Sequence, residues 1–171
     1  RMRYLINNNF RGEPNELFVT LTYAENMTDT ERLYEDFKKF MKRLRYAHKH
    51  LTSIDYLSVI EPQKRGAWHA HVLLKFNDAK RIIYVSNEEM RNYWGHGVVK
   101  VNSLKNVDNI GAYLSAYLTD LELDPEDLKR VGVESKNITI RRVDGEDKKF
   151  IKGGRLHMYP PGMNLYRSSR G

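Results

Sequence analysis

Two histidines, His69 and His71, have the residue type and the spacing that most directly suggest chemistry. They are two positions apart in the apolar segment 67–76 (AWHAHVLLKF), which has the pattern of a β-strand. Side chains alternate between the faces of a strand, so both imidazoles project from one face and form half of a metal site. Glu61 ends the preceding strand and could reach the same point as a third ligand, with Gln63 as the substitute. A solvated strand end is the other interpretation of Glu61.

Two tyrosines, Tyr113 and Tyr117, are a second candidate for chemistry. They are four positions apart in the segment 107–119 (VDNIGAYLSAYLT), whose apolar residues recur at helical spacing. On a helix this spacing places both phenols on one face, one turn apart, with Asn109 before them on that face. Tyrosines at this spacing are more often packing residues than nucleophiles. A His-x-His strand upstream strengthens the case for a nucleophile.

The elements that would position these side chains follow from hydrophobic periodicity. Strands are predicted over residues 17–23, 54–61, 67–76 and 96–101, with weaker candidates over 137–143 and 148–151. Residues 62–66 are predicted to connect two of these strands as a hairpin, and the tail from residue 153 is predicted to be largely irregular. Strands interleaved with helices predict an α+β fold, with a central antiparallel sheet of ferredoxin-like or RNA-recognition-like type and flanking helices.

Two helix starts are predicted from capping-box spacing. Thr28 followed by Glu31 precedes apolar residues at three- and four-residue steps, which predict an amphipathic helix that ends near Lys49. Ser86 followed by Glu89 predicts the start of a second, shorter helix. The polar side of the first helix is strongly basic, which indicates either an ordinary solvated face or a phosphate-binding one.

The composition bounds the class of protein. The chain has 171 residues, of which 40% are hydrophobic and 30% charged, so it is globular, and we expect a single domain over residues 1–171 that was cut from a longer protein. No stretch approaches the roughly 20 apolar residues of a membrane span, and no signal peptide is recognisable. Cysteine is absent, which excludes disulfides and thiolate chemistry and agrees with a cytoplasmic location.

The net charge points to a polyanionic partner. Lys and Arg number 29 against 22 Asp and Glu, a balance of +7, so nucleic acid is favoured over a membrane surface, with a merely basic soluble domain as the alternative. The candidate nucleic-acid contacts are basic or aromatic, or lie beside the tyrosines; they are Lys42, Arg43, Lys64, Arg65, Trp94 and Asn109. Solvated basic residues and a core position for Trp94 are the competing interpretations.

Three segments together resemble the motifs of HUH endonucleases: residues 18–23 (FVTLTY), 66–74 (GAWHAHVLL) and 109–119 (NIGAYLSAYLT). The combination is most similar to rolling-circle replication initiators of plasmids, integrative elements and single-stranded DNA phages. The order of the motifs agrees with this branch, because the histidine pair precedes the tyrosines, whereas conjugative relaxases have the tyrosine first. The tail, residues 155–171, is also similar to the end of the nicking domain in Gram-positive element initiators.

The resemblance implies an HUH endonuclease fold and a metal-dependent DNA nicking and strand-transfer activity. A tyrosine attacks a phosphodiester of single-stranded origin DNA at a hairpin or nick site, which leaves a 5′-phosphotyrosine link and a free 3′-hydroxyl. His69, His71 and Glu61 would hold Mg²⁺ or Mn²⁺, which polarises the scissile phosphate. Mixed imidazole and carboxylate ligands suit Mn²⁺, while Mg²⁺ is the more available ion. A host helicase is a further expected partner, and the oligomeric state is open.

One departure from the family pattern concerns the tyrosine helix. The family commonly has a lysine three residues after a tyrosine, but this chain has Ala116 and Asp120 at the corresponding positions. The role of that lysine is either absent or falls to another residue, such as Lys105 or Lys129. Initiators with one tyrosine place it at the later position, so the resemblance implies that Tyr117 attacks first and that the earlier tyrosine serves termination.

Three other functions compete with the initiator. A related HUH transposase or relaxase would use the same chemistry on another target. A recognition-like RNA- or DNA-binding module without catalysis would have a purely structural histidine pair. A cupin-like metal enzyme is the fourth interpretation, although its extra strands and ligand histidine are hard to place in this chain.

Overall fold

The computed structural model describes residues 2–63, 66–78, 81–104, 109–111, 121–123, 138–143, 146–151 and 166–169. The chain divides into two compact units, Arg1–Gly111 with Asn164–Gly171, and Ala112–Met163. The expectation of a single domain over residues 1–171 stays a prediction. No helix among the described residues is long and apolar enough to cross a membrane.

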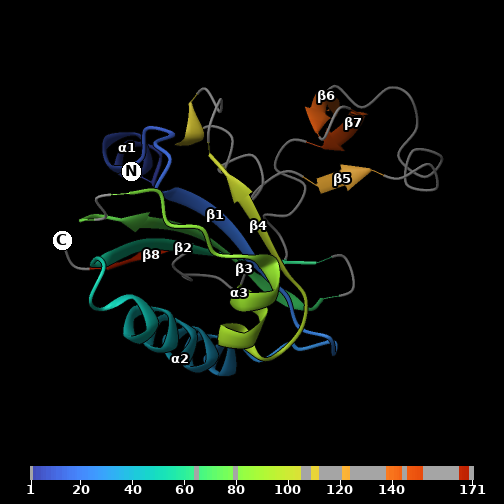
Figure 1. Cartoon of the computed structure of the whole chain (residues 1–171). Helices are drawn as coiled ribbons and strands as arrows, with labels where there is room; N and C mark the ends of the chain where they lie inside the picture. Colours follow the sequence, from blue (N-terminus) through green and yellow to red (C-terminus); the bar gives the residue numbers. More distant parts are fainter. Residues whose placement is uncertain are drawn as a thin grey trace. The chain divides into compact units, whose positions relative to one another are not determined.

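The first unit is built on a five-stranded antiparallel sheet in the order β4-β1-β3-β2-β8 (Figure 1). The strands are β1 (Glu16–Leu21), β2 (Ile54–Pro62), β3 (Trp68–Phe76), β4 (Val99–Ser103) and β8 (Tyr166–Ser168). The helices are α1 (Met2–Asn9), α2 (Thr30–His48) and α3 (Asn87–Trp94). The chain order β1-α2-β2-β3-α3-β4 with the sheet order 4-1-3-2 is the ferredoxin-like split βαβ arrangement. The predicted α+β class and antiparallel sheet are therefore confirmed.

The two faces of the sheet have different coverings. Tyr56 of β2 lies edge-on against Phe37 of α2, with ring centroids 5.0 Å apart, and its partner on β3 is Leu74. This side, the helix face, is the one that α2 and α3 cover in Figure 1. α1 lies against the opposite face, where Lys75 Nζ donates to the carbonyl of Asn9 over 3.0 Å. Because alternate residues of a strand change sides, His69 and His71 fall on the face opposite α2, which we call the triad face.

α2 begins one residue later than the capping signal predicted. The N-cap is Asp29, whose carboxylate accepts from the backbone N–H of Glu31 at 3.0 Å and of Arg32 at 3.2 Å. The prediction that Thr28 caps this helix is wrong, because an aspartate is at least as good an N-cap and its negative charge also interacts favourably with the positive helix start. The second start is confirmed, since Ser86 Oγ accepts from the N–H of Glu89 at 3.1 Å. The apolar stripe of α2 is buried as predicted: Leu33, Phe37, Phe40, Met41 and Leu44.

Two elements of the first unit were not predicted. The tail contains β8, which pairs antiparallel with β2 through Leu57 opposite Ser168 and Val59 opposite Tyr166. The prediction of a largely irregular tail is wrong for these residues, because three residues are too short to show a strand period and the open edge of β2 determines the pairing. The helix α1 was also missed, and its Ile6 is fully buried.

A glycine joins α3 to β4 where the chain passes close to β1. A Cβ on Gly97 would lie 2.5 Å from the carbonyl oxygen of Thr22 and 2.7 Å from the nitrogen of Ala24. The adjacent backbone is paired there, with the N–H of Ala24 donating to His96 over 3.0 Å. The predicted strand over 96–101 begins only at Val99, since these three residues form the close approach that precedes it.

The second unit contains a three-stranded antiparallel sheet in the order β5-β7-β6. Its strands are β5 (Leu121–Leu123), β6 (Ile138–Val143) and β7 (Glu146–Ile151). β6 and β7 pair from Ile138 opposite Ile151 to Val143 opposite Glu146, so the predicted hairpin of residues 137–151 is confirmed. The predicted helix over 107–119 lies outside the described residues except for 109–111, of which Ile110 and Gly111 are helical.

Candidate metal centre

The hairpin of β2 and β3 brings together the three residues predicted as metal ligands. Glu61 is paired directly opposite His69, and His71 follows two residues later on the same face. Glu61 Oε2 lies 2.6 Å from His69 Nε2 and also contacts His71 Nε2. One ligand atom from each residue lies within 4.8 Å of the others, so this Glu–His–His triad could hold one metal ion.

The triad is deeply buried in the triad face. The side chains of Glu61 and His71 are 2% and 3% exposed, while His69 is 14% exposed and forms the open side. Burial, and to a smaller extent the neighbouring His69 imidazole, lower the pKa of His71 well below its ordinary value. His71 is therefore a neutral imidazole near pH 7, which is the form that offers a lone pair to a cation.

Each imidazole is oriented through its other ring nitrogen. His71 Nδ1 lies 3.2 Å from Thr20 Oγ1, and its ring stacks on Phe18 with centroids 5.4 Å apart. His69 Nδ1 lies 3.0 Å from the side-chain amide of Gln63. Outer contacts of this kind select the tautomer and hold the ring in place at metal sites. Gln63 therefore touches the nitrogen remote from the triad, and its sequence-based role as a substitute ligand gives way to that of an orienting partner.

The chemistry of the donor set fits a divalent cation. When Nδ1–H of each imidazole donates to its outer partner, both Nε2 lone pairs and the Glu61 carboxylate face one another. Three acceptors directed at one point repel each other unless a cation or a shared proton lies between them. Two imidazole nitrogens and one carboxylate oxygen are ligands that Mn²⁺ accepts readily, and Mg²⁺ with additional oxygen ligands.

The other predicted site residues are distributed differently. Lys64, Arg65, Tyr113 and Tyr117 lie outside the described residues, so their roles stay predictions. The helix α2, which carries Lys42 and Arg43, covers the face of the sheet opposite the triad. Both side chains are exposed, and Arg43 Nη1 donates to the carbonyl of Tyr93 over 3.0 Å. The structure therefore separates these basic residues from the triad instead of bringing them together.

Trp94 is a core residue, and the prediction that it stacks on DNA bases is wrong. Its side chain is 0% exposed, and its indole Nε1 donates to the carbonyl of Thr22 over 2.7 Å. The ring packs edge-on against Tyr23 and Phe40, with centroids 5.1 and 6.2 Å away. A tryptophan at the end of an amphipathic helix suits both roles, and packing against α2 and the end of β1 decides between them.

Trp94→Ala is expected to destabilise the protein by about 3–5 kcal/mol, because it leaves a large cavity and an unpaired carbonyl at Thr22. Urea unfolding followed by circular dichroism measures the loss. Tyr46→Ala, at a side chain 71% exposed, is the control and should change stability by less than about 0.5 kcal/mol. Equal losses in the two variants would contradict the core position of Trp94.

Asn109 lies where the tyrosine-bearing segment begins, and α1 contacts it. Its backbone has a positive φ of 50°, and its side-chain Oδ1 accepts from Asn7 Nδ2 over 3.1 Å. Asn7 Oδ1 in turn accepts from the backbone N–H of Gly111 over 3.0 Å, in the manner of a helix cap. Sequence reasoning missed Asn7, because this contact spans 104 positions and no local pattern signals it.

Tyr23 is excluded as the nucleophile. It is buried on the helix face, and its phenol donates to Asp36 Oδ2 over 2.8 Å. Burial first, and then the hydrogen bond to Asp36, raise the pKa of Tyr23 far above its ordinary value, so the phenol stays protonated. A tyrosine that attacks phosphorus needs the opposite environment, with the phenolate favoured and the oxygen accessible.

Comparison with known families gives one match. The model of a family described as a replication-associated protein of the ORF2 type matches residues 16–122. The matched region extends from β1 through β5 and contains the Glu–His–His triad and both tyrosines of the 107–119 segment. Comparisons with curated proteins and with solved structures find no significant match.

Proposed function

Because the chain belongs to this family of replication-associated proteins, we propose that it is a rolling-circle replication initiator that nicks single-stranded origin DNA. The observation that carries the proposal is the Glu–His–His triad, buried in the sheet face opposite α2. Two tyrosines at helical spacing follow it in the sequence, within the matched region. The basic net charge of +7 supports a nucleic-acid substrate.

In the proposed reaction Tyr117 is the first nucleophile. Its Oη bonds to the scissile phosphorus as the bond from phosphorus to the 3′ oxygen breaks. The phenol loses its proton, and the released 3′ oxygen takes one up to give a hydroxyl that can prime synthesis. One phosphodiester replaces another, so the step is reversible, and Tyr113 can serve the later transfer that rejoins strands.

The residues of the triad supply the electrostatic part of this step. A divalent cation held by His69, His71 and Glu61 would polarise the scissile phosphate and stabilise its developing charge. Burial keeps His71 neutral for this role, and Thr20 and Gln63 hold the imidazole rings. The partly exposed edge of His69 is the side from which a phosphate can approach.

The proposal is tested with labelled single-stranded DNA from the origin region of the element that encodes the protein. Incubation with Mn²⁺ should give a protein–DNA band that survives denaturation, and EDTA should prevent it. Mass mapping of the DNA-linked peptide should identify Tyr117. Reversible binding without any covalent product would instead favour a non-catalytic nucleic-acid-binding module.

Asn7 is expected to affect cleavage through the start of the tyrosine segment. Asn7→Ala removes the hydrogen bond to Gly111 and should slow single-turnover cleavage about two- to tenfold, the effect of roughly 0.5–1.5 kcal/mol per hydrogen bond. Asn7→Asp keeps an acceptor for the same N–H and should lose less. Asn8→Ala, at an exposed position of the same helix, is the matched control. Equal rates for Asn7→Ala and Asn8→Ala would contradict a positioning role.

A further inference from the structure

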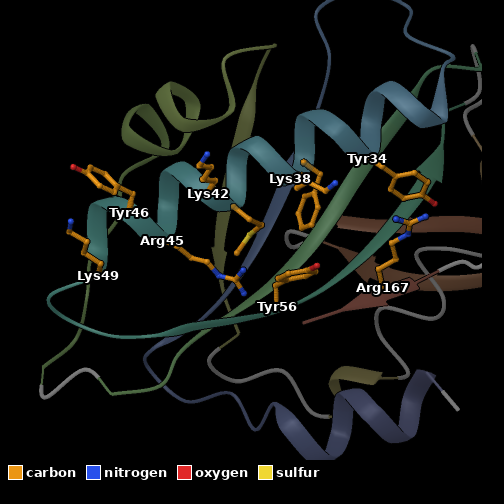
Figure 2. A pocket seen from close by; sticks show the side chains of 10 residues that line it. Tyr34, Lys38, Lys42, Arg45, Tyr46, Lys49, Tyr56 and Arg167 are labelled. Atoms are coloured by element: carbon orange, nitrogen blue, oxygen red, sulfur yellow. The ribbon is translucent and has the colours of Figure 1, made fainter. Parts of the chain in front are cut away.

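A groove of about 530 Å³ runs along α2 on the helix face, away from the triad (Figure 2). Most of its lining comes from α2, between Tyr34 and Lys49, and the rest from Tyr56 of β2 and Arg167 of β8. These ends of α2 are 15 residues apart, which corresponds to about 22 Å along the helix at 1.5 Å per residue. We call this feature the α2 groove.

The charge of the α2 groove is of one sign. Its cations are Lys38, Lys42, Arg45, Lys49 and Arg167, and no carboxylate is among the lining residues. At the exposed rim, the carboxylate of Glu35 lies 3.6 Å from Lys38 Nζ. Within the described parts of the chain, neither Lys42 nor Lys49 has a carboxylate partner. A concave surface with this charge favours a polyanion.

The tyrosines of the α2 groove each lie beside a cation. The guanidinium of Arg167 lies 3.4 Å from the ring centroid of Tyr34, and Lys49 Nζ lies 4.4 Å from that of Tyr46. Arg45 lies 5.5 Å from the centroid of Tyr56 and is held in place by donating to the carbonyl of Ile54. Figure 2 shows these pairs following one another along the groove.

Exposed aromatic rings distinguish between the possible polyanions. Tyr46 is 71% exposed, so its ring is not used for packing within the described protein. A DNA duplex offers phosphates but keeps its bases stacked internally, and an acidic peptide has no flat π-face. Single-stranded nucleic acid has both phosphates and unstacked bases, which is the combination that cations alternating with aromatic rings recognise.

We propose that the α2 groove binds a segment of single-stranded nucleic acid, with phosphates on its rim cations and bases on its tyrosine rings. The sheet separates this segment from the Glu–His–His triad, so the strand held in the groove is not the phosphodiester being cut. The inference rests on the proposed function only for the class of partner. It assigns the protein a second contact with the strand, which retains DNA on the helix face while chemistry takes place on the other.

Binding is measured by fluorescence anisotropy with fluorescein-labelled oligothymidylate of about ten nucleotides, in EDTA so that no cleavage occurs. Tyr46→Ala is expected to weaken binding about tenfold, within the range for loss of one stacked base, whereas Tyr46→Phe keeps the ring and the affinity. Because Tyr46 is exposed, neither variant threatens folding. Equal affinities of the alanine and phenylalanine variants would overturn the proposal.

The salt dependence tests the cationic rim. Lys49→Ala should reduce the slope of log K against log salt concentration by about 0.7, the value for one phosphate contact on a single strand. Lys39→Ala is the matched control, because Lys39 is an exposed lysine of the same helix that does not line the groove. Equal slope changes in the two variants would overturn the proposal. So would tighter binding of duplex DNA than of the single strand, or displacement of the probe by polyglutamate more readily than by unlabelled oligothymidylate.

Cleavage of a short nick-site oligonucleotide separates this proposal from the proposed function. Tyr117→Phe should still bind oligothymidylate through the groove but form no covalent product. Tyr46→Ala should still form covalent product from the short oligonucleotide, which reaches only the triad face. Loss of cleavage in all proteins with groove binding intact would contradict the initiator alone, while normal cleavage with unaltered binding in Tyr46→Ala would contradict the groove alone.

Discussion

Tyr117→Phe is expected to abolish the covalent protein–DNA product and to lower the rate of strand cleavage by at least about 10⁴-fold. Removing the attacking oxygen removes the reaction path itself, and the remaining metal-assisted hydrolysis by water is slow. The measurement is a denaturing gel of labelled single-stranded DNA after incubation with Mn²⁺. Because phenylalanine keeps the ring, a loss of product cannot be ascribed to a packing defect.

Tyr113→Phe is the matched control for that experiment. It should retain the first cleavage and lose the second transfer, which is measured as rejoining of a cleaved strand to a labelled acceptor. Normal covalent product from Tyr117→Phe, together with its loss in Tyr113→Phe, would reverse the proposed order of the two tyrosines. Normal product from both single variants and from the double variant would exclude a tyrosine mechanism at this segment.

His71→Ala is expected to reduce cleavage about 10²–10³-fold, since it removes a ligand that is 3% exposed at the centre of the triad. Glu61→Ala should have a similar effect, because its Oε2 contacts both imidazoles. Excess EDTA should reproduce the loss in the unaltered protein, and added Mn²⁺ should reverse it. His50→Ala, at an exposed histidine just after α2, is the control and should keep full activity.

A readout without DNA checks the same site. At a Mn²⁺ concentration about 100 times Kd, binding to the folded state should stabilise the unaltered protein by about 2.7 kcal/mol, seen as a rise in Tm. His71→Ala should show no such rise. A Mn²⁺-dependent shift of equal size in the variant would mean that the ion binds elsewhere, and the triad would then be an ordinary buried polar cluster.

The triad was predictable because strands have a strict period. Two histidines two positions apart must share a face, and a short hairpin places Glu61 opposite His69 once the strand limits are known. The ferredoxin-like order followed from strong periodic segments interrupted by capping signals. These inferences depend on local patterns that extend over several residues.

Features that depend on distant contacts were not predictable. β8 has three residues and takes its conformation from the edge of β2. The burial of Trp94 depends on Thr22, 72 positions away, and the role of Asn7 on Gly111. The α2 groove needs Arg167 from the tail beside Tyr34 of the helix, so the basic helix face was recognisable but its concave, aromatic character was not.

The pairing of β8 with β2 gives the second unit an unusual topology of attachment. Residues 112–163 leave the first unit after Gly111 and return to it at Asn164, so this unit is an insertion tethered at both ends. A protease that cuts once within the insertion would yield two fragments that remain associated through the β2–β8 ladder, as split proteins do. Mixing separately expressed fragments divided at such a point should therefore reconstitute the first unit.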